Sequence, residues 1–210
     1  MILLTPEQVK DVTMTSPERI AGLHTALQEV HNNNIAGDFV ECGVWRGGNI
    51  IIAKTFFDSV NDPRTCWAYD TFEGMTAPSE GDPRRAHEYW NHLTVKCLSP
   101  LEEVINNFKK FNVADGTINV VQGDVAETLL DPVAIPDTIA ILRLDTDWYA
   151  STLVELEVLY SRLVPGGYLI IDDYGHWEGC KKAVDKFFGE EFVTNNFVKL
   201  DDTGIMYKKV

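Results

Sequence analysis

From Gly37 onward the sequence alternates short apolar runs with stretches of helical periodicity. The apolar runs have strand character and cover residues 38–42, 65–69, 118–121, 139–144 and 168–171. A helical stretch follows the first run, at about 49–58, and another follows the fourth, at 152–162, until Pro165-Gly166-Gly167 ends it. This alternation is typical of β-α-β units, so the chain is predicted to form an α/β fold around a mostly parallel sheet.

The two ends of the chain and one long segment complete the predicted organisation. Residues 1–36 are expected to be a helical N-terminal segment, in which Ser16 caps a helix that starts at Pro17. Residues 192–198 and 205–208 flank a turn and predict an antiparallel C-terminal hairpin. Residues 74–100 have weak periodicity and are too long for a simple connection, so we interpret them as a lid or insertion. A length of 210 residues predicts a single domain over 1–210.

Charge and cysteine usage limit the kinds of partner. Asp and Glu number 32 against 18 Lys and Arg, which gives a net charge of −14. That field repels nucleic acid and anionic membrane, so neither is an expected partner. The sequence has no apolar run near the roughly 20 residues that cross a bilayer and no recognisable export signal. Its four cysteines include no C-x-x-C pair, which predicts reduced thiols and a cytoplasmic protein.

A glycine-rich turn follows the first predicted strand. The sequence Glu41-Cys42-Gly43-Val44-Trp45-Arg46-Gly47-Gly48 leads from strand into helix, where backbone N–H groups can approach a ligand. The spacing differs from the G-x-G-x-x-G of dinucleotide sites, and the carboxylate of Glu41 beside Gly43 favours a cationic cofactor. S-adenosylmethionine (SAM) fits, because its amino and sulfonium groups are positive. Asp70 at the end of the second strand is placed for the ribose, and Asp124 after the third could reach the adenine.

Four aspartates follow the next two strands. Asp145 and Asp147 end the fourth strand, and Asp172 and Asp173 end the fifth. So much like charge at one edge of a sheet requires a neutralising cation, and oxygen ligands favour Mg²⁺ or Ca²⁺ over zinc. A bound Mg²⁺ would orient two vicinal oxygens of an acceptor and acidify one of them, leaving a nearby carboxylate to take the proton.

Several ordered motifs resemble one known family. They are FVECGVWRGG (39–48), AYDTFEGM (68–75), QGD (122–124), LRLDTDWYAST (142–152), LVPGGYLIIDDYG (163–175) and CKKAVDKF (180–187). From about residue 38 to residue 188 the chain resembles the macrocin O-methyltransferase (TylF-type) family of SAM-dependent, Mg²⁺-dependent sugar O-methyltransferases. The resemblance implies a class I methyltransferase fold, which is a Rossmann-like three-layer sandwich with a mostly parallel seven-stranded sheet and an antiparallel C-terminal hairpin.

The resemblance also divides the acidic residues by role. It implies that Asp145, Asp172 and Asp173 hold Mg²⁺ and that Asp147 is the general base. The residues Glu41, Gly43, Asp70 and Asp124 would bind SAM. The implied acceptor is a hydroxyl group of a sugar or of a glycosylated small molecule. The residues alone identified the acidic group but did not separate metal ligands from base.

The sequence is also compatible with other functions. The acceptor could be a non-sugar vicinal diol or a catechol, and the protein could be a non-catalytic SAM-binding relative. An NAD-dependent oxidoreductase is disfavoured, because the chain lacks G-x-G-x-x-G and an evident Tyr-x-x-x-Lys pair. Trp148, His176 and Trp177 are expected to shape the acceptor pocket, and His176 is an alternative base. A homo-oligomer is a general expectation for such enzymes.

Overall fold

The computed structural model describes residues 1–94 and 96–210 and contains one seven-stranded sheet in the order β3-β2-β1-β4-β5-β7-β6. The strands are β1 (Asp38–Cys42), β2 (Cys66–Asp70), β3 (Ile118–Gln122), β4 (Ile139–Leu144), β5 (Leu163–Ile171), β6 (Val198–Lys199) and β7 (Ile205–Lys208). The first five are mutually parallel, whereas β7 runs antiparallel to both β5 and β6. The predicted α/β class and the mostly parallel sheet are confirmed.

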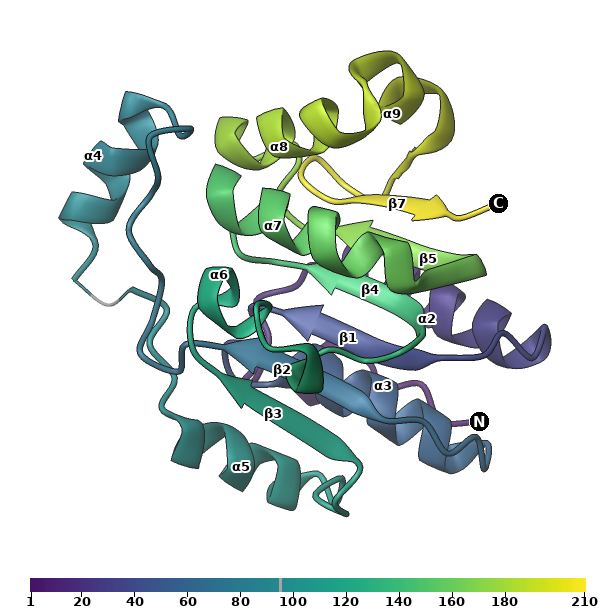
Figure 1. The fold of residues 1–210 in the computed structure, drawn as a ribbon. Coiled ribbons are helices and arrows are strands. Elements are labelled where there is room, and N and C mark those ends of the chain that lie inside the picture. The colour runs from purple at the N-terminus through teal and green to yellow at the C-terminus, as the bar shows by residue number, and fades with distance from the viewer. Residues whose placement is uncertain (95) are drawn as a thin grey trace.

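Helices cover both faces of the sheet and make three layers (Figure 1). They are α1 (Pro6–Val9), α2 (Pro17–Asn32), α3 (Gly48–Ser59), α4 (Arg84–His92), α5 (Leu101–Lys110), α6 (Val125–Thr128), α7 (Tyr149–Leu159), α8 (Glu178–Phe188) and α9 (Glu190–Asn196). Apolar side chains of α2, α3 and α5 form the core on one face, and those of α7 and α8 form the core on the other. These five helices thus bury their apolar sides against the central sheet.

Local sequence signals account for the start of α2. The Ser16 hydroxyl accepts a hydrogen bond from the N–H of Arg19 at 3.2 Å, and Pro17 occupies the first helical position. This is the predicted cap, and it satisfies a backbone donor that has no partner within the helix. Short 3₁₀ helices lie at Pro132–Ala134 and Tyr160–Arg162. In the part of the chain that the structure describes, no helix is both long and apolar enough to span a membrane.

The C-terminal hairpin is shorter than predicted. Residues 190–196, which include most of the expected first strand, form helix α9, and β6 contains two residues only. The helix stacks Phe192 on Phe188 of α8, with ring centroids 5.6 Å apart, and buries Val193. These tertiary contacts outweigh the β propensity of the local sequence.

The Pro165-Gly166-Gly167 segment was predicted to end a helix and instead lies within β5. The preceding α-helix ends earlier, at Leu159, and a 3₁₀ turn leads into the strand. A register shift between β4 and β5 accommodates the segment, and the N–H of Gly166 donates to the carbonyl of Lys209 at 2.7 Å. Proline is tolerated in a strand where pairing is irregular.

The parallel strands all end at one edge of the sheet. The segment that carries α4 lies beyond that edge, to one side of the sheet (Figure 1). Residues 74–100 therefore project over the ends of the strands that carry the acidic residues. Their interpretation as a lid remains a prediction, but their position suits it.

Candidate active site

A cavity of about 360 Å³ opens at the carboxyl edge of the sheet. Loops after each of the five parallel strands line it, together with parts of the N-terminal segment and of residues 74–100. Open α/β sheets bind ligands at this edge. The predicted site residues that line the cavity are Gly43, Asp70, Asp124, Asp145, Asp147, Asp172 and Asp173.

Gly43 brings the loop after β1 directly against the loop after β4. Its φ of +83° lies in the left-handed region that favours glycine. A Cβ atom at this position would lie 1.9 Å from the carbonyl oxygen of Asp145. The close approach of the two backbones therefore requires glycine, and it places the glycine-rich loop beside the acidic loop.

The acids at the ends of β2 and β3 line the cavity and also organise backbone. Asp70 accepts hydrogen bonds from the N–H groups of Trp45 and Phe72, each at 2.9 Å. Burial raises the pKa of Asp70, and these backbone donors act in the opposite direction. Asp124 caps α6 by accepting from the N–H of Ala126 at 2.9 Å. Carboxylate oxygens can accept further hydrogen bonds, so both residues remain available to a ligand.

Glu41 points into the protein instead of into the cavity. It is fully buried, and its Oε1 accepts from Asn49 Nδ2 at 2.9 Å and from an Nη of Arg143 at 2.7 Å. Burial raises the pKa of Glu41 to about 7, although Arg143 and Asn49 lower it. Asn49, in the first turn of α3, lines the cavity. In this arrangement Glu41 can influence a ligand through Asn49, and its direct contact with a cofactor remains a prediction.

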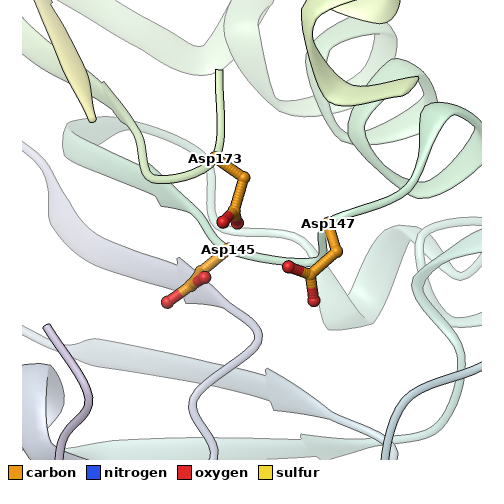
Figure 2. A group of neighbouring side chains, drawn as sticks. All are labelled: Asp145, Asp147 and Asp173. Carbon is orange, nitrogen blue, oxygen red and sulfur yellow. The ribbon is translucent and has the colours of Figure 1, made fainter. Parts of the chain in front are cut away.

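Three of the four aspartates converge. Asp145, Asp147 and Asp173 each offer one oxygen, and these oxygens all lie within 4.8 Å of one another (Figure 2). The Oδ2 atom of Asp173 is buried and has no hydrogen-bond partner among the described residues. An unpaired buried carboxylate oxygen is costly unless a cation occupies the site. The donor set consists of oxygens alone and therefore fits a hard divalent cation such as Mg²⁺.

Asp172 lies beside this cluster but faces two arginines. Arg143 contacts one of its oxygens and Arg19 the other. Burial raises the pKa of Asp172 to about 6, while Arg143 and Arg19 lower it and Asp145 raises it. The structure thus separates Asp172 from the three converging carboxylates, and its role as a metal ligand remains a prediction.

Arg143 is the buried cation that connects these groups. Its side chain is 1% exposed and reaches Glu41, Asp145 at 2.6 Å and Asp172. It also donates to Thr15 Oγ1 at 3.1 Å. Burial acts to lower the pKa of Arg143, but the surrounding carboxylates have the larger effect and raise it above its ordinary value. The guanidinium therefore stays charged and offsets part of the negative charge.

The acidic residues are difficult to ionise together. Burial, together with the negative charges of Asp145 and Asp172, raises the pKa of Asp147 to about 8. Burial likewise raises the pKa of Asp173 well above its ordinary value, with Asp147 as the next cause. Carboxylates that share a site repel one another, so one or more of them holds a proton until a cation binds.

Asp147 also has an unusual backbone conformation. Its φ is +68°, and the N–H of Trp148 donates to the carbonyl of Thr146 at 2.7 Å. This is a γ-turn with a positive central φ, which is rare and strained. Strain of this kind persists where the surrounding structure imposes it, and it is concentrated at functional sites. The turn directs the carboxylate of Asp147 toward those of Asp145 and Asp173 (Figure 2).

Aromatic side chains form the wall beside the acidic cluster. Trp177 and His176 line the cavity, with ring centroids 4.7 Å apart. Trp148, which is also expected to shape the pocket, does not line the cavity itself. Its ring lies 4.9 Å from that of Trp177, and its Nε1 donates to the carbonyl of Thr76 at 2.9 Å. Trp148 therefore supports Trp177 from behind.

Sequence reasoning missed several residues of the site. Arg143 carried a signal that could have found it, because it interrupts the buried apolar strand Ile139–Leu144. An arginine in such a strand must have an acidic partner. The other missed residues are Thr15, Arg19, Asn49 and Tyr89, which all line the cavity. Their local sequences carry no comparable signal, since tertiary packing brings them to the site.

Comparison with known proteins identifies the family. Residues 5–209 match the family described as Macrocin-O-methyltransferase (TylF). The chain belongs to this family. The predicted resemblance and the class of enzyme, an O-methyltransferase, are therefore confirmed.

Named relatives agree with this family. A demethyldecarbamoylnovobiocin O-methyltransferase of Streptomyces niveus is 34% identical over 94% of this chain and 75% of its own length. An 8-demethyl-8-(2,3-dimethoxy-alpha-L-rhamnosyl)-tetracenomycin-C 4'-O-methyltransferase of Streptomyces olivaceus is 36% identical over 93% of this chain and 75% of its own length.

Solved structures confirm the class I methyltransferase fold. The O-methyltransferase NovP is 33% identical, with a TM-score of 0.84 over 95% of this chain and 82% of its own. The calicheamicin methyltransferase CalS11 has the same fold at 19% identity, with a TM-score of 0.68 over 98% of this chain and 80% of its own.

Proposed function

We propose that this methyltransferase transfers a methyl group from SAM to a hydroxyl group of a sugar carried by a small molecule, with Mg²⁺ in the acidic cluster. Related enzymes are named for glycosylated or antibiotic acceptors. One name specifies a rhamnosyl tetracenomycin, and another specifies mycinamicin III, the latter enzyme being from Micromonospora griseorubida. The acceptor class of this chain is inferred from them.

One observation carries the proposal: a single cavity joins the glycine-rich loop to the acidic cluster. Gly43, Asp70 and Asp124 line one part of it, and Asp145, Asp147 and Asp173 line the other. A methyl donor held at the first part and a hydroxyl group held at the second would meet within one cavity. Methyl transfer needs little beyond such alignment.

The residues of the cofactor part fit the chemistry of SAM. Backbone N–H groups near the start of α3 can bind the carboxylate of the methionine moiety. Asp70 stands at the end of β2, where α/β nucleotide sites place the acid that binds ribose hydroxyl groups. Asp124, at the end of β3, can accept from the adenine amine.

In the acidic part, Asp145 and Asp173 would hold Mg²⁺, with Asp172 as the further ligand that the family pattern implies. When bound, Mg²⁺ lowers the pKa of a hydroxyl group that it contacts. Asp147 accepts the hydroxyl proton as the oxygen bonds to the methyl carbon and the carbon–sulfur bond breaks, which releases S-adenosylhomocysteine (SAH). Asp147 must be ionised to accept this proton, and a cation in the acidic cluster favours its ionised form.

The test begins with binding. Thermal shift and calorimetric titrations would use SAH and NAD, each with Mg²⁺ and with a chelator, because a ligand specific for the folded state raises its stability. We expect stabilisation by SAH and none by NAD. Turnover would then be measured with SAM on TDP-rhamnose, demethyldecarbamoylnovobiocin, methyl rhamnoside and catechol. Methylation of catechol alone would mean that the acceptor is a catechol and not a sugar. SAH binding without turnover on any of these acceptors would indicate a non-catalytic SAM-binding protein.

A glycine pair provides a matched control for the cofactor part. We expect Gly43→Ala to abolish SAH binding, because its Cβ would collide with the carbonyl of Asp145. Gly116 also has a positive φ, +85°, but nothing lies within 4 Å of a Cβ built there. Gly116→Ala introduces similar backbone strain without the collision and should bind SAH normally. Equal loss in both variants would mean that strain alone, and not the geometry of the loop, controls binding.

A further inference from the structure

Residues 74–100 are attached to the loops that carry the acidic cluster. The carbonyl of Thr76 accepts from Trp148 Nε1 at 2.9 Å, and Asp82 Oδ1 accepts from the N–H of Tyr149 at 2.8 Å. The ring of Tyr89 lies 5.0 Å from that of Trp177. Trp148 and Tyr149 directly follow Asp147 in sequence, and Trp177 lies four residues after Asp173. The segment is thus fixed to the two acidic loops at three points.

Asp82 provides the central attachment. Its side chain is buried, with 7% of the residue exposed, and Oδ2 accepts from the N–H of Ser79 at 2.8 Å and from its hydroxyl at 2.7 Å. Oδ1 holds Tyr149, the first residue of α7. Trp148 precedes that helix, and its side chain makes no capping hydrogen bond. Asp82 therefore supplies the acceptor and the negative charge that favour a helix start, from 67 positions away in the sequence.

The neighbouring helix leaves room for this carboxylate. A Cβ at Gly179, in the first turn of α8, would lie 1.8 Å from Asp82 Oδ1. A Cβ at Gly81 would lie 2.0 Å from the ring of Tyr149. Glycine at both positions permits the segment to lie directly on the starts of α7 and α8. The attachment is therefore closely packed and specific.

The attachment determines where Tyr89 lies. Helix α4 begins two residues after Asp82, and Tyr89 extends from it to line the cavity together with Trp177 and His176. Tyr89 remains 46% exposed, so one part of its ring is free to contact a ligand. Its neighbour Trp90 packs within residues 74–100 instead. The Nε1 of Trp90 donates to the carbonyl of Met75 at 3.4 Å, and Lys96 lies over its ring.

We propose that Tyr89 determines acceptor specificity and that Asp82 is a positioning residue that holds it there. Tyr89 and Trp177 together form an aromatic wall beside the acidic cluster, which suits the apolar C–H face of a pyranose ring whose hydroxyl groups point to the carboxylates. Asp82 acts through Tyr149 and α4 and does not touch the acceptor. This inference rests on the proposed function for its choice of acceptor but not for the attachment itself.

The first experiment measures the attachment without any acceptor. Hydrogen–deuterium exchange of the SAH-bound protein would follow the amide of Tyr149 and the amides of α4. In Asp82→Ala we expect exchange of both to accelerate at least tenfold. Glu80→Ala is the matched control, since it removes an exposed acid two positions away, and it should exchange as the wild type does. Unchanged exchange in Asp82→Ala would overturn the positioning role.

The second experiment measures the consequence for the acceptor. The binding of methyl rhamnoside to the protein with SAH and Mg²⁺ would be followed by tryptophan fluorescence, and the KM of the best acceptor by turnover. We expect Asp82→Ala and Tyr89→Ala each to weaken acceptor binding about tenfold, in line with the contribution of an aromatic contact. The SAH dissociation constant should stay within about twofold, and kcat should change less than KM.

Two further variants separate this proposal from general destabilisation. Tyr89→Ala should leave exchange at Tyr149 unchanged while it weakens acceptor binding. Asp82→Asn should recover part of the affinity, because its amide oxygen can still accept from Tyr149 although its NH₂ group faces the Ser79 donors. Accelerated exchange with normal acceptor affinity would refute the role of Tyr89. If the wild type neither binds nor methylates a sugar, the proposed function fails, while the exchange result still decides the role of Asp82.

Discussion

The two parts of the cavity differ in how completely their polar groups are paired. In the cofactor part, Asp70 accepts two backbone N–H groups and Asp124 caps a helix. In the acidic part, Asp173 keeps a buried oxygen that has no partner in the described chain, and the pKa of Asp147 is raised by burial to about 8. Asp70 and Asp124 are therefore paired with backbone, whereas the carboxylates of the acidic part would gain from a cation.

Arginine accounts for part of this difference. Arg143 and Arg19 provide two positive charges near five carboxylates, those of Glu41, Asp145, Asp147, Asp172 and Asp173. The arginines pair with the carboxylates that face the protein interior, although Oε2 of Glu41 has no hydrogen-bond partner among the described residues. The remaining negative charge faces the cavity, which a divalent cation and an acceptor can enter.

The largest expected effect is on turnover, in the acidic part. Asp147→Asn keeps the shape of the side chain but removes the proposed base, so kcat should fall about 10²- to 10⁴-fold. The SAH dissociation constant should not change, because the cofactor part is intact. Single-turnover kinetics and calorimetry measure the two quantities. An active Asp147→Asn would assign the base elsewhere, with His176 as the first residue to test.

The next largest effect concerns Arg143, which pairs with three carboxylates behind the cavity. Arg143→Met leaves Glu41, Asp145 and Asp172 without their shared cation, and the free energy of unfolding should fall by about 3–5 kcal/mol. Arg84→Met is the control, because Arg84 pairs with Glu88 on the surface with its side chain 90% exposed. That exposed pair should contribute less than about 1 kcal/mol. Urea denaturation measures both, and a similar small loss in the two variants would contradict a central role for Arg143.

Metal binding should distinguish the two parts directly. At a Mg²⁺ concentration one hundred times the dissociation constant, we expect a stabilisation of about 2.7 kcal/mol, which a chelator reverses. Asp173→Ala should abolish this stabilisation and leave that by SAH in place. Asp131→Ala, which removes an exposed acid outside the cavity, is the control. Stabilisation by Mg²⁺ that persists in Asp173→Ala would place the ion elsewhere.

The smallest expected effect lies at the outer border of the acidic part. Asp201 accepts from Arg19 Nε at 2.8 Å, from Ser16 Oγ at 2.6 Å and from the N–H of Gly204 at 2.7 Å. Although burial acts to raise it, these hydrogen bonds and Arg19 hold the pKa of Asp201 below its ordinary value. Asp201→Asn should lower stability by about 1–2 kcal/mol at pH 7.

The pH dependence of this difference follows from the direction of the pKa shift. A carboxyl group with a lowered folded pKa stabilises the protein above its ordinary value of about 3.9, and this contribution is lost as the pH falls through the folded pKa. The stability difference between Asp201→Asn and wild type should therefore be constant from pH 7 to about 5 and decrease below about 4. Urea denaturation across that range measures it. A difference that grows in acid would show that Asp201 is not ionised in the folded protein.

Much of the fold could be predicted because its signals are local. The strand before Gly43 and the apolar strand at 139–144 were placed to within a residue. Residues 192–196 were assigned to a strand because their local β propensity favours it, but stacking of Phe192 on Phe188 selects a helix. That contact depends on the position of α8, which a local pattern does not contain.

The sequence by itself determined that the aspartates gather at one edge of the sheet. Aspartates that follow successive parallel strands must reach the same edge of the sheet, because a parallel sheet aligns the carboxyl ends of its strands. Tertiary structure alone decided how these groups pair. Glu41 joins Arg143 across 102 positions, and Asp82 joins Tyr149 across 67. Pairings over such separations depend on strand register and on the packing of helices, which arise only when the whole chain folds.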